Sequence, residues 1–207
     1  MTGIINYGAG NIYSVITAFK KCGEEVFIIN NPSDFSKADR LVLPGVGAFG
    51  DGIRSLDESG LKIALSGSVK SGKPFLGICL GLQLLFDHSE EGDCEGLKLI
   101  KGNVIKFSFP FSESMKVPHM GWNQVQVKYN GKELFLNIPD KTWFYFAHSY
   151  FAAPEKSNTI AAITCYGHEF ASVVKMNNIV GVQFHPEKSG DYGLCFIKNF
   201  LEGKWLQ

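Results

Sequence analysis

The most informative part of the sequence is Lys73-Pro74-Phe75-Leu76-Gly77-Ile78-Cys79-Leu80-Gly81-Leu82-Gln83-Leu84-Leu85-Phe86. It opens with a short apolar run that predicts a buried strand, and the segment after the run predicts a helix. Cys79 stands at the junction, two positions after Gly77 and two positions before Gly81. This spacing is typical of a nucleophile elbow, a turn so sharp that larger neighbouring side chains would collide. The stretch therefore indicates an α/β fold with a nucleophilic cysteine at the end of a strand.

The setting of Cys79 favours a thiolate, because a helix N-terminus offers free N–H groups and the positive end of the helix dipole. A buried core thiol is the alternative, and it is the commoner state of a free cysteine. The paired glycines favour the nucleophile here. We interpret Cys165 and Cys195 as packing residues and Cys22 as part of a helix end. The five cysteines are scattered without a Cys-x-x-Cys pair, so neither a disulfide framework nor a zinc site is indicated.

The segments before the elbow alternate between strand and helix patterns. Short β-branched runs predict strands over Thr2–Asn6, Glu25–Ile29 and Arg40–Leu43, and apolar residues at helical spacing predict helices over Asn11–Lys21 and Leu61–Val69. This order predicts a parallel sheet that is covered on both faces.

From about Val104 the pattern changes to sequential strands that are partly antiparallel. Leu194, Ile197 and Leu201 predict a closing amphipathic helix. The expected strands are Val125–Tyr129, Trp143–Ala147, Thr159–Thr164 and a hairpin of Ser172–Lys175 with Ile179–Phe184 around Asn177-Asn178. The chain is therefore expected to form one α/β domain with mixed strands added to a parallel core.

Length and charge limit the possible functions. The 207 residues suffice for one well-cored domain, and 20 lysine and arginine residues balance 20 aspartate and glutamate residues. Without a basic excess, nucleic acid is not an expected partner. No apolar run approaches the roughly 18 to 20 residues that span a bilayer, and the N-terminus lacks the features of a secretory signal. We expect a cytoplasmic protein without a membrane partner.

A thiol nucleophile needs a base and a group that orients the base. His185 ends the apolar run Ile179–Phe184, and Glu187 follows two residues later across the stiff Pro186. Functional groups gather at the carboxyl ends of parallel strands, so His185 can stand beside Cys79. A purely structural His185–Glu187 bond is the alternative, but the cysteine elbow favours catalysis. We interpret the other histidines differently: His88 and His168 as solvated, and His119 as part of a connection.

One motif suggests a different chemistry. Gly45-Val46-Gly47-Ala48-Phe49-Gly50 matches the Gly-x-Gly-x-x-Gly pattern of dinucleotide-binding folds. However, it follows the third expected strand rather than the first, Pro44 precedes it, and no acidic residue ends a strand about 20 residues later. We interpret it as a turn whose N–H groups can stabilise an oxyanion, and we expect no cofactor and no metal.

Three motifs in this order resemble those of the class I (triad) glutamine amidotransferases: Pro44–Gly47, Gly77–Gly81 and Phe184–Glu187. Four further stretches narrow the resemblance to the glutaminase subunits of imidazole glycerol phosphate synthase, of histidine biosynthesis: Tyr7–Asn11, Pro118–Asn123, His148–Tyr150 and Gln183–Ser189. The resemblance covers essentially the whole chain. It implies that residues 1–207 form a single type 1 amidotransferase domain with a flavodoxin-like fold, a mostly parallel central sheet flanked by helices and extended by mixed or antiparallel strands.

The resemblance also implies residue roles. Cys79 would attack the side-chain amide of L-glutamine, His185 would act as base, and Glu187 would orient it. The oxyanion would be held by the backbone N–H of Leu80 and by that of Val46 or Gly47. Positions that hold glutamine match Gln83, Glu91, Ser149 and Tyr150, and positions near the partner interface match Asn11, Trp122, Tyr145 and Lys188. Each of these eight residues could also be an ordinary core or surface residue.

The implied partner is a synthase or cyclase subunit, a (β/α)8 barrel, that forms a heterodimer with this chain and receives its ammonia to make imidazole glycerol phosphate and AICAR. Alternatives stay open at this point. A paralogous glutaminase subunit could feed another synthase, such as a sugar-modifying one. Another cysteine hydrolase is disfavoured by the late His-Pro-Glu motif, and a noncatalytic binding module would leave the elbow, base and carboxylate without a purpose.

Overall fold

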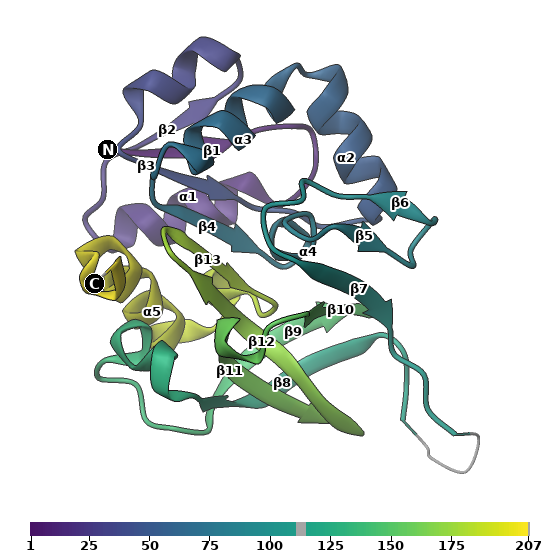
Figure 1. Ribbon diagram of the computed structural model, residues 1–207. Coiled ribbons are helices and arrows are strands. Elements are labelled where there is room, and N and C mark those ends of the chain that lie inside the picture. Colours follow the sequence, from purple (N-terminus) through teal and green to yellow (C-terminus); the bar gives the residue numbers. More distant parts are fainter. Residues whose placement is uncertain (111–114, 207) are drawn as a thin grey trace.

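The computed structural model describes residues 1–110 and 115–206 (Figure 1). In these residues the main sheet has nine strands in the order β2-β1-β3-β4-β13-β12-β11-β8-β9. Their bounds are β1 (Thr2–Ile5), β2 (Val26–Ile29), β3 (Arg40–Leu43), β4 (Phe75–Ile78), β8 (His119–Val127), β9 (Thr142–His148), β11 (Ile160–Tyr166), β12 (His168–Met176) and β13 (Ile179–Val182).

The first five strands of this order are parallel, and the other four run antiparallel to their neighbours. The parallel strands follow the doubly wound order 2-1-3-4-5 of flavodoxin-like folds, because β13 serves as the fifth strand beside β4. The expected parallel core and its antiparallel extension are therefore confirmed. The hairpin around Asn177-Asn178 is confirmed as well, since β12 and β13 pair antiparallel on either side of it.

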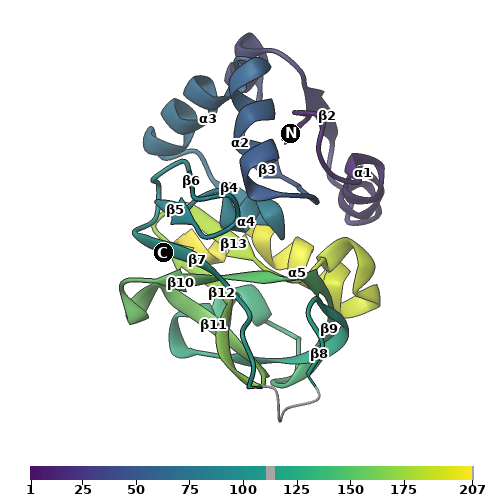
Figure 2. The same ribbon diagram turned by 90° about the vertical axis from the view of Figure 1, so that its right-hand side faces the viewer.

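Five α-helices occur in the described residues, and they lie on both sides of the parallel strands (Figure 2). Phe19 of α1 and Phe196 of α5 are buried in one core, while Leu56 of α2 and Leu65 of α3 are buried in the other. The bounds are α1 (Ile12–Lys21), α2 (Phe49–Glu58), α3 (Leu61–Lys70), α4 (Leu80–Gln83) and α5 (Gly190–Glu202). None of these helices has the length and the apolar character that crossing a membrane requires.

Among the α-helices of the described residues, α2 is the one that the sequence analysis did not predict. Its apolar residues Phe49, Ile53 and Leu56 have helical spacing and are buried. Gly50 and Gly52 within it are poor helix formers, so the local preference opposed the helix that packing stabilises. The Gly-x-Gly-x-x-Gly match thus spans the end of a loop and the start of this helix.

A smaller sheet extends the fold next to the elbow. It has the strand order β10-β7-β5-β6 and was not predicted as a separate sheet. Its strands are β5 (His88–Ser89), β6 (Cys94–Glu95), β7 (Gly102–Lys106) and β10 (Tyr150–Pro154).

Short 3-10 helices connect several of these elements. They are η1 (Pro32–Lys37), η2 (Tyr129–Phe135), η3 (Ser157–Thr159), η4 (Pro186–Lys188) and η5 (Lys204–Leu206).

Two interpretations of single residues are wrong. His119 does not lie in a connection: it begins β8 and is buried. Cys165 is not a packing residue, because its side chain is exposed near the end of β11. Cys195 is only partly buried, and Cys22 caps the C-terminus of α1 as expected.

Candidate active site

The elbow at Cys79 has the expected geometry. Cys79 adopts φ 54° and ψ −106° between β4 and α4, a backbone conformation that only a sharp, constrained turn imposes on a non-glycine residue. A Cβ atom on Gly77 would collide with the carbonyl of Gly81, and one on Gly81 would collide with the carbonyl of Leu43. The two flanking glycines are therefore required by close backbone approach, as predicted.

His185 reaches Cys79 because their strands are neighbours. β13 pairs with β4 in parallel, with Val182 opposite Ile78, so the residues after both strands emerge at the same edge of the sheet. His185 is buried, and the neighbouring Cys79 side chain acts to raise its pKa. Its Nδ1 lies 2.7 Å from Oε1 of Glu187. Since a carboxylate only accepts, Nδ1 carries the proton and Nε2 is left to face the sulfur.

The surroundings of His185 set its charge. Burial acts to lower its pKa, but hydrogen bonds with Cys79 and Glu187 and the negative charges of both raise the pKa to about 10. An imidazole in this setting is protonated at neutral pH. It can therefore pair with a thiolate and give a proton to a leaving group.

A cavity of about 200 Å³ opens beside Cys79, and it brings together the residues that the resemblance implied for binding. All four glutamine positions and all three oxyanion positions border it. The lining residues are Val46, Gly47, Cys79, Leu80, Gln83, Glu91, Pro118, Met120, Ala147, His148, Ser149 and Tyr150. The cavity suits a small ligand that presents one end to the sulfur.

The oxyanion donors are not all available in this structure. The Leu80 N–H donates to the Gly45 carbonyl at 3.3 Å, so this donor is occupied by the chain itself. Gly47 has φ 111°, a conformation open to glycine, and Val46 beside it is 44% exposed. The Gly45–Val46 peptide would have to reorient before Leu80 could bind an oxyanion.

Glu91 and Gln83, two of the positions expected to bind glutamine, also make hydrogen bonds within the protein. Glu91 accepts a hydrogen bond from the Phe49 N–H at 2.7 Å and so caps the start of α2. Gln83 donates to the Tyr150 carbonyl at 2.8 Å and to Oε1 of Gln183 at 3.2 Å. Gln83 thus has only its own carbonyl oxygen to offer a ligand.

Three of the four interface positions form a cluster beside His185. The Trp122 and Tyr145 rings lie 6.2 Å apart, and the Lys188 ammonium lies 5.8 Å from the Tyr145 ring centre. The Tyr145 carbonyl accepts from the His185 N–H at 2.8 Å. The side chain of Asn11, the fourth interface position, caps α1 by accepting from the Ser14 N–H at 3.2 Å.

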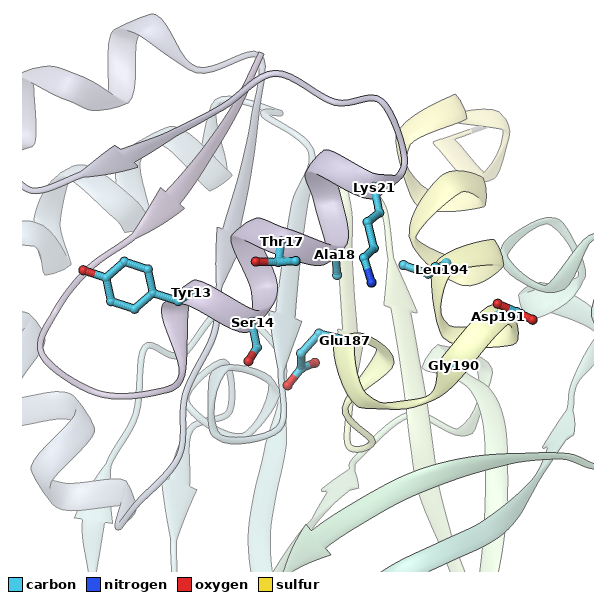
Figure 3. A pocket seen from close by; sticks show the side chains of 9 residues that line it. All are labelled: Tyr13, Ser14, Thr17, Ala18, Lys21, Glu187, Gly190, Asp191 and Leu194. Atoms are coloured by element: carbon cyan, nitrogen blue, oxygen red, sulfur yellow. The ribbon is translucent and has the colours of Figure 1, made fainter.

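A second cavity, of about 390 Å³, borders Glu187 between α1 and α5 (Figure 3). Figure 3 shows the Glu187 carboxylate pointing toward α1, whose residues Ser14 and Thr17 border the same cavity. Oε2 of Glu187 is buried and has no hydrogen bond partner within the described residues. Only one oxygen of the carboxylate is thus held, by His185.

The sequence analysis missed a buried pair of histidines, His119 and His148, of which His148 also lines the cavity. His148 Nδ1 lies 2.8 Å from the Tyr150 carbonyl, which can only accept, so this nitrogen carries the proton. His148 Nε2 therefore accepts from Nδ1 of His119 at 2.9 Å, and His119 Nε2 accepts from Asn123 at 3.2 Å. Both rings are neutral in this chain. The His148–Tyr150 motif was the available signal, but it does not reveal the distant partner His119.

The pair predicts a loss of stability in acid. Burial lowers the pKa of His119 to about 4 and that of His148 to about 3, so between these values and 6.5 the unfolded chain binds more protons than the folded chain. Stability therefore falls as the pH drops through this window. Chemical unfolding at several pH values should show a shallower dependence for His119→Asn, which keeps a donor near His148. The exposed control His168→Asn should keep the wild-type dependence; an unchanged dependence in His119→Asn would contradict the assignment.

In the described parts of the chain, no group of three His, Cys, Asp or Glu side chains is arranged to hold a metal ion. The Gly-x-Gly-x-x-Gly stretch borders the cavity at Cys79 with its loop and leads into α2.

Comparisons with known proteins identify the family of this chain. The family described as glutamine amidotransferase class-I matches residues 3–203. The imidazole glycerol phosphate synthase subunit HisH of Sulfurimonas denitrificans is 47% identical over 100% of both chains, and that of Neisseria meningitidis serogroup B is 44% identical over 97% of this chain and 98% of its own. A glutamine amidotransferase crystal structure (TM-score 0.75, 17% identity) and PurLQS from Thermotoga maritima (TM-score 0.74, 19% identity) each share the fold over 97% of both chains. The chain therefore belongs to the class I glutamine amidotransferase family.

Proposed function

We propose that this chain is the glutaminase subunit of an imidazole glycerol phosphate synthase. It hydrolyses L-glutamine to glutamate and ammonia, and the ammonia passes to a cyclase subunit, a (β/α)8 barrel that forms a heterodimer with this chain. The observation that carries the glutaminase part is the arrangement of Cys79, His185 and Glu187 beside a cavity that also collects the oxyanion and glutamine positions. The identity to HisH subunits along the whole chain supports the choice of synthase.

The proposed reaction runs in two steps. The Cys79 thiolate attacks the side-chain amide carbon of glutamine, and His185 gives its proton to the departing nitrogen as the C–N bond breaks. Ammonia leaves and a γ-glutamyl thioester remains on the sulfur. His185 then takes a proton from water, the hydroxide attacks the thioester, and glutamate departs as the thiolate re-forms. Glu187 holds the imidazole in the required tautomer throughout.

We propose that Gln83, Glu91, Ser149 and Tyr150 hold the glutamine. The cavity's small volume of about 200 Å³ supports a ligand of this size. The oxyanion of each tetrahedral intermediate would be bound by the N–H of Leu80 and that of Val46 or Gly47. The Gly45 carbonyl on the Leu80 N–H supports a resting state in which this hole is closed.

The partner is proposed to dock on the face that carries Trp122, Tyr145 and Lys188, with Asn11 at the start of α1 as a further contact. Exposed apolar side chains on the paired strands β8 and β9 support an interface there: Met120, Trp122 and Trp143 are each at least half exposed. We further propose that residues 1–207 act as one unit, because the parallel and antiparallel strands form one continuous sheet.

The proposed function predicts a switch. The isolated chain should release ammonia slowly from glutamine, and the synthase with its acceptor ligand should raise the rate about a hundred- to a thousand-fold. This is the factor by which the rate typically falls when one oxyanion donor is removed. The partner would act by favouring the reoriented Gly45–Val46 peptide. Steady-state ammonia release with and without partner and acceptor tests this. Equal rates in all conditions would identify a free-standing glutaminase instead.

A further inference from the structure

Gln183 is a buried polar residue next to Cys79, and it has no role in the two reaction steps described above. Its side chain is fully buried after the end of β13, two residues before His185. Its Nε2 lies 3.7 Å from Sγ of Cys79, and its Oε1 accepts from Nε2 of Gln83 at 3.2 Å. It therefore connects the sulfur to the residue that also bonds with the Tyr150 carbonyl.

The orientation of both amides follows from the backbone. The Tyr150 carbonyl can only accept, so the group of Gln83 that lies 2.8 Å from it must be the NH₂ group. The same NH₂ group faces Gln183, which must then present its oxygen to Gln83. This leaves the NH₂ group of Gln183 on the side of the Cys79 sulfur. One carbonyl thus determines which end of two consecutive amides faces the nucleophile.

We propose that Gln183 is a catalytic residue that donates a hydrogen bond to the Cys79 sulfur and stabilises it as a thiolate. A donor facing a sulfur favours its anionic form, and hydrogen bonds to charged groups are stronger than neutral ones. Away from water, such a donor cannot be replaced by solvent. The proposal deepens the proposed function, since it names a further group that activates the same nucleophile.

Gln183 and His185, the two groups that face the Cys79 sulfur, are held in place by residues of different elements. Gln83 belongs to α4 and holds Gln183 from the side of the elbow helix, whereas Glu187 holds His185 from η4. The sulfur also lies 3.8 Å from the Ala147 carbonyl, an acceptor that a thiol can face but a thiolate cannot use. The Gln183 donor opposes that preference for the thiol.

Two variants remove the donor while keeping the chain length of the side chain. Gln183→Glu keeps an oxygen for Gln83 but replaces the NH₂ group, and Gln183→Met has neither group and no charge. The full-length protein is treated with iodoacetamide at one fixed neutral pH, and labelling of each cysteine is followed by peptide mass spectrometry. The exposed Cys165 in the same molecule is the internal control for reagent and time.

Both variants should label Cys79 about tenfold more slowly, the effect of losing one hydrogen bond to a charged group, with Cys165 unchanged. With the partner present, kcat for ammonia release should fall by a similar factor, and KM should stay within about twofold. Asn199→Leu is the matched control: Asn199 is buried and donates to the Leu134 and Leu136 carbonyls, so this variant loosens a polar contact far along the chain from the elbow. It should leave Cys79 labelling unchanged.

Wild-type labelling of Cys79 in both Gln183 variants would overturn the proposal, and so would an equal slowing in Asn199→Leu. If Gln183→Glu does not fold, Gln183→Met decides alone. The labelling needs neither glutamine nor partner. A wild-type complex with acceptor ligand that fails to release ammonia would therefore refute the glutaminase proposal, while the labelling rates still decide the role of Gln183.

Discussion

Cys79→Ala should abolish ammonia release from glutamine, with a loss of about five to six orders of magnitude in kcat, as expected when a covalent nucleophile is removed. The fold should persist, because alanine keeps the Cβ atom that the elbow already accommodates at φ 54° and removes only the sulfur. Measured ammonia release by the complex, with circular dichroism as a check on folding, tests both statements. Retained glutamine-dependent turnover would refute the nucleophile.

The same variant separates the two activities of the complex. Under the proposed function a partner subunit performs the acceptor chemistry, so the Cys79→Ala complex should still form product from externally supplied ammonium. Cys165→Ala, which removes an exposed sulfur, should behave as wild type with glutamine and with ammonium. Failure of Cys79→Ala with ammonium would show that the substitution also damages the synthase.

Glu187→Gln should lower kcat by about three to four orders of magnitude, although it preserves the shape of the side chain. The carboxylate is 3% exposed and lies 2.7 Å from His185 Nδ1, so an amide there can offer its NH₂ group and favour the wrong imidazole tautomer. It also removes one of the charges that raise the pKa of His185. Single-turnover hydrolysis of glutamine by the complex measures the effect.

The control for this substitution is Glu25→Gln, which makes the same change at an exposed position just before β2 and should leave turnover unchanged. A decrease of only a few-fold in Glu187→Gln would show that His185 does not depend on its carboxylate.

Local patterns predicted the parts of the fold whose causes are local. Strand β3 was predicted to the residue, because a short apolar β-branched run buries on both faces of a parallel sheet. Helix α2 was missed, because glycines lower its local preference and only packing against the second core selects it. His119 was misplaced for a related reason: its burial depends on β8 pairing with β9.

The candidate site shows the same division. The elbow motif pointed to Cys79 and the His-Pro-Glu motif to His185 and Glu187, because each motif carries its own geometry within a few residues. Gln183 was quoted only as part of a motif, since its partners Cys79 and Gln83 lie about a hundred positions earlier in the chain. Nothing in the local sequence says which end of its amide faces the sulfur.

The parallel core and the family resemblance followed from the sequence alone, and so did the prediction of Cys79 as nucleophile with His185 as its base, because these depend on neighbouring residues and on apolar periodicity. Three contacts became visible in the tertiary structure alone. The Leu80 N–H donates to the Gly45 carbonyl, His119 and His148 form a neutral pair, and the Gln183 NH₂ group faces the Cys79 sulfur. Each of these is a contact between segments that the sheet register brings together. Hydrogen bonds of this kind are directional and act over about 3 Å, so a spacing in the sequence does not specify them.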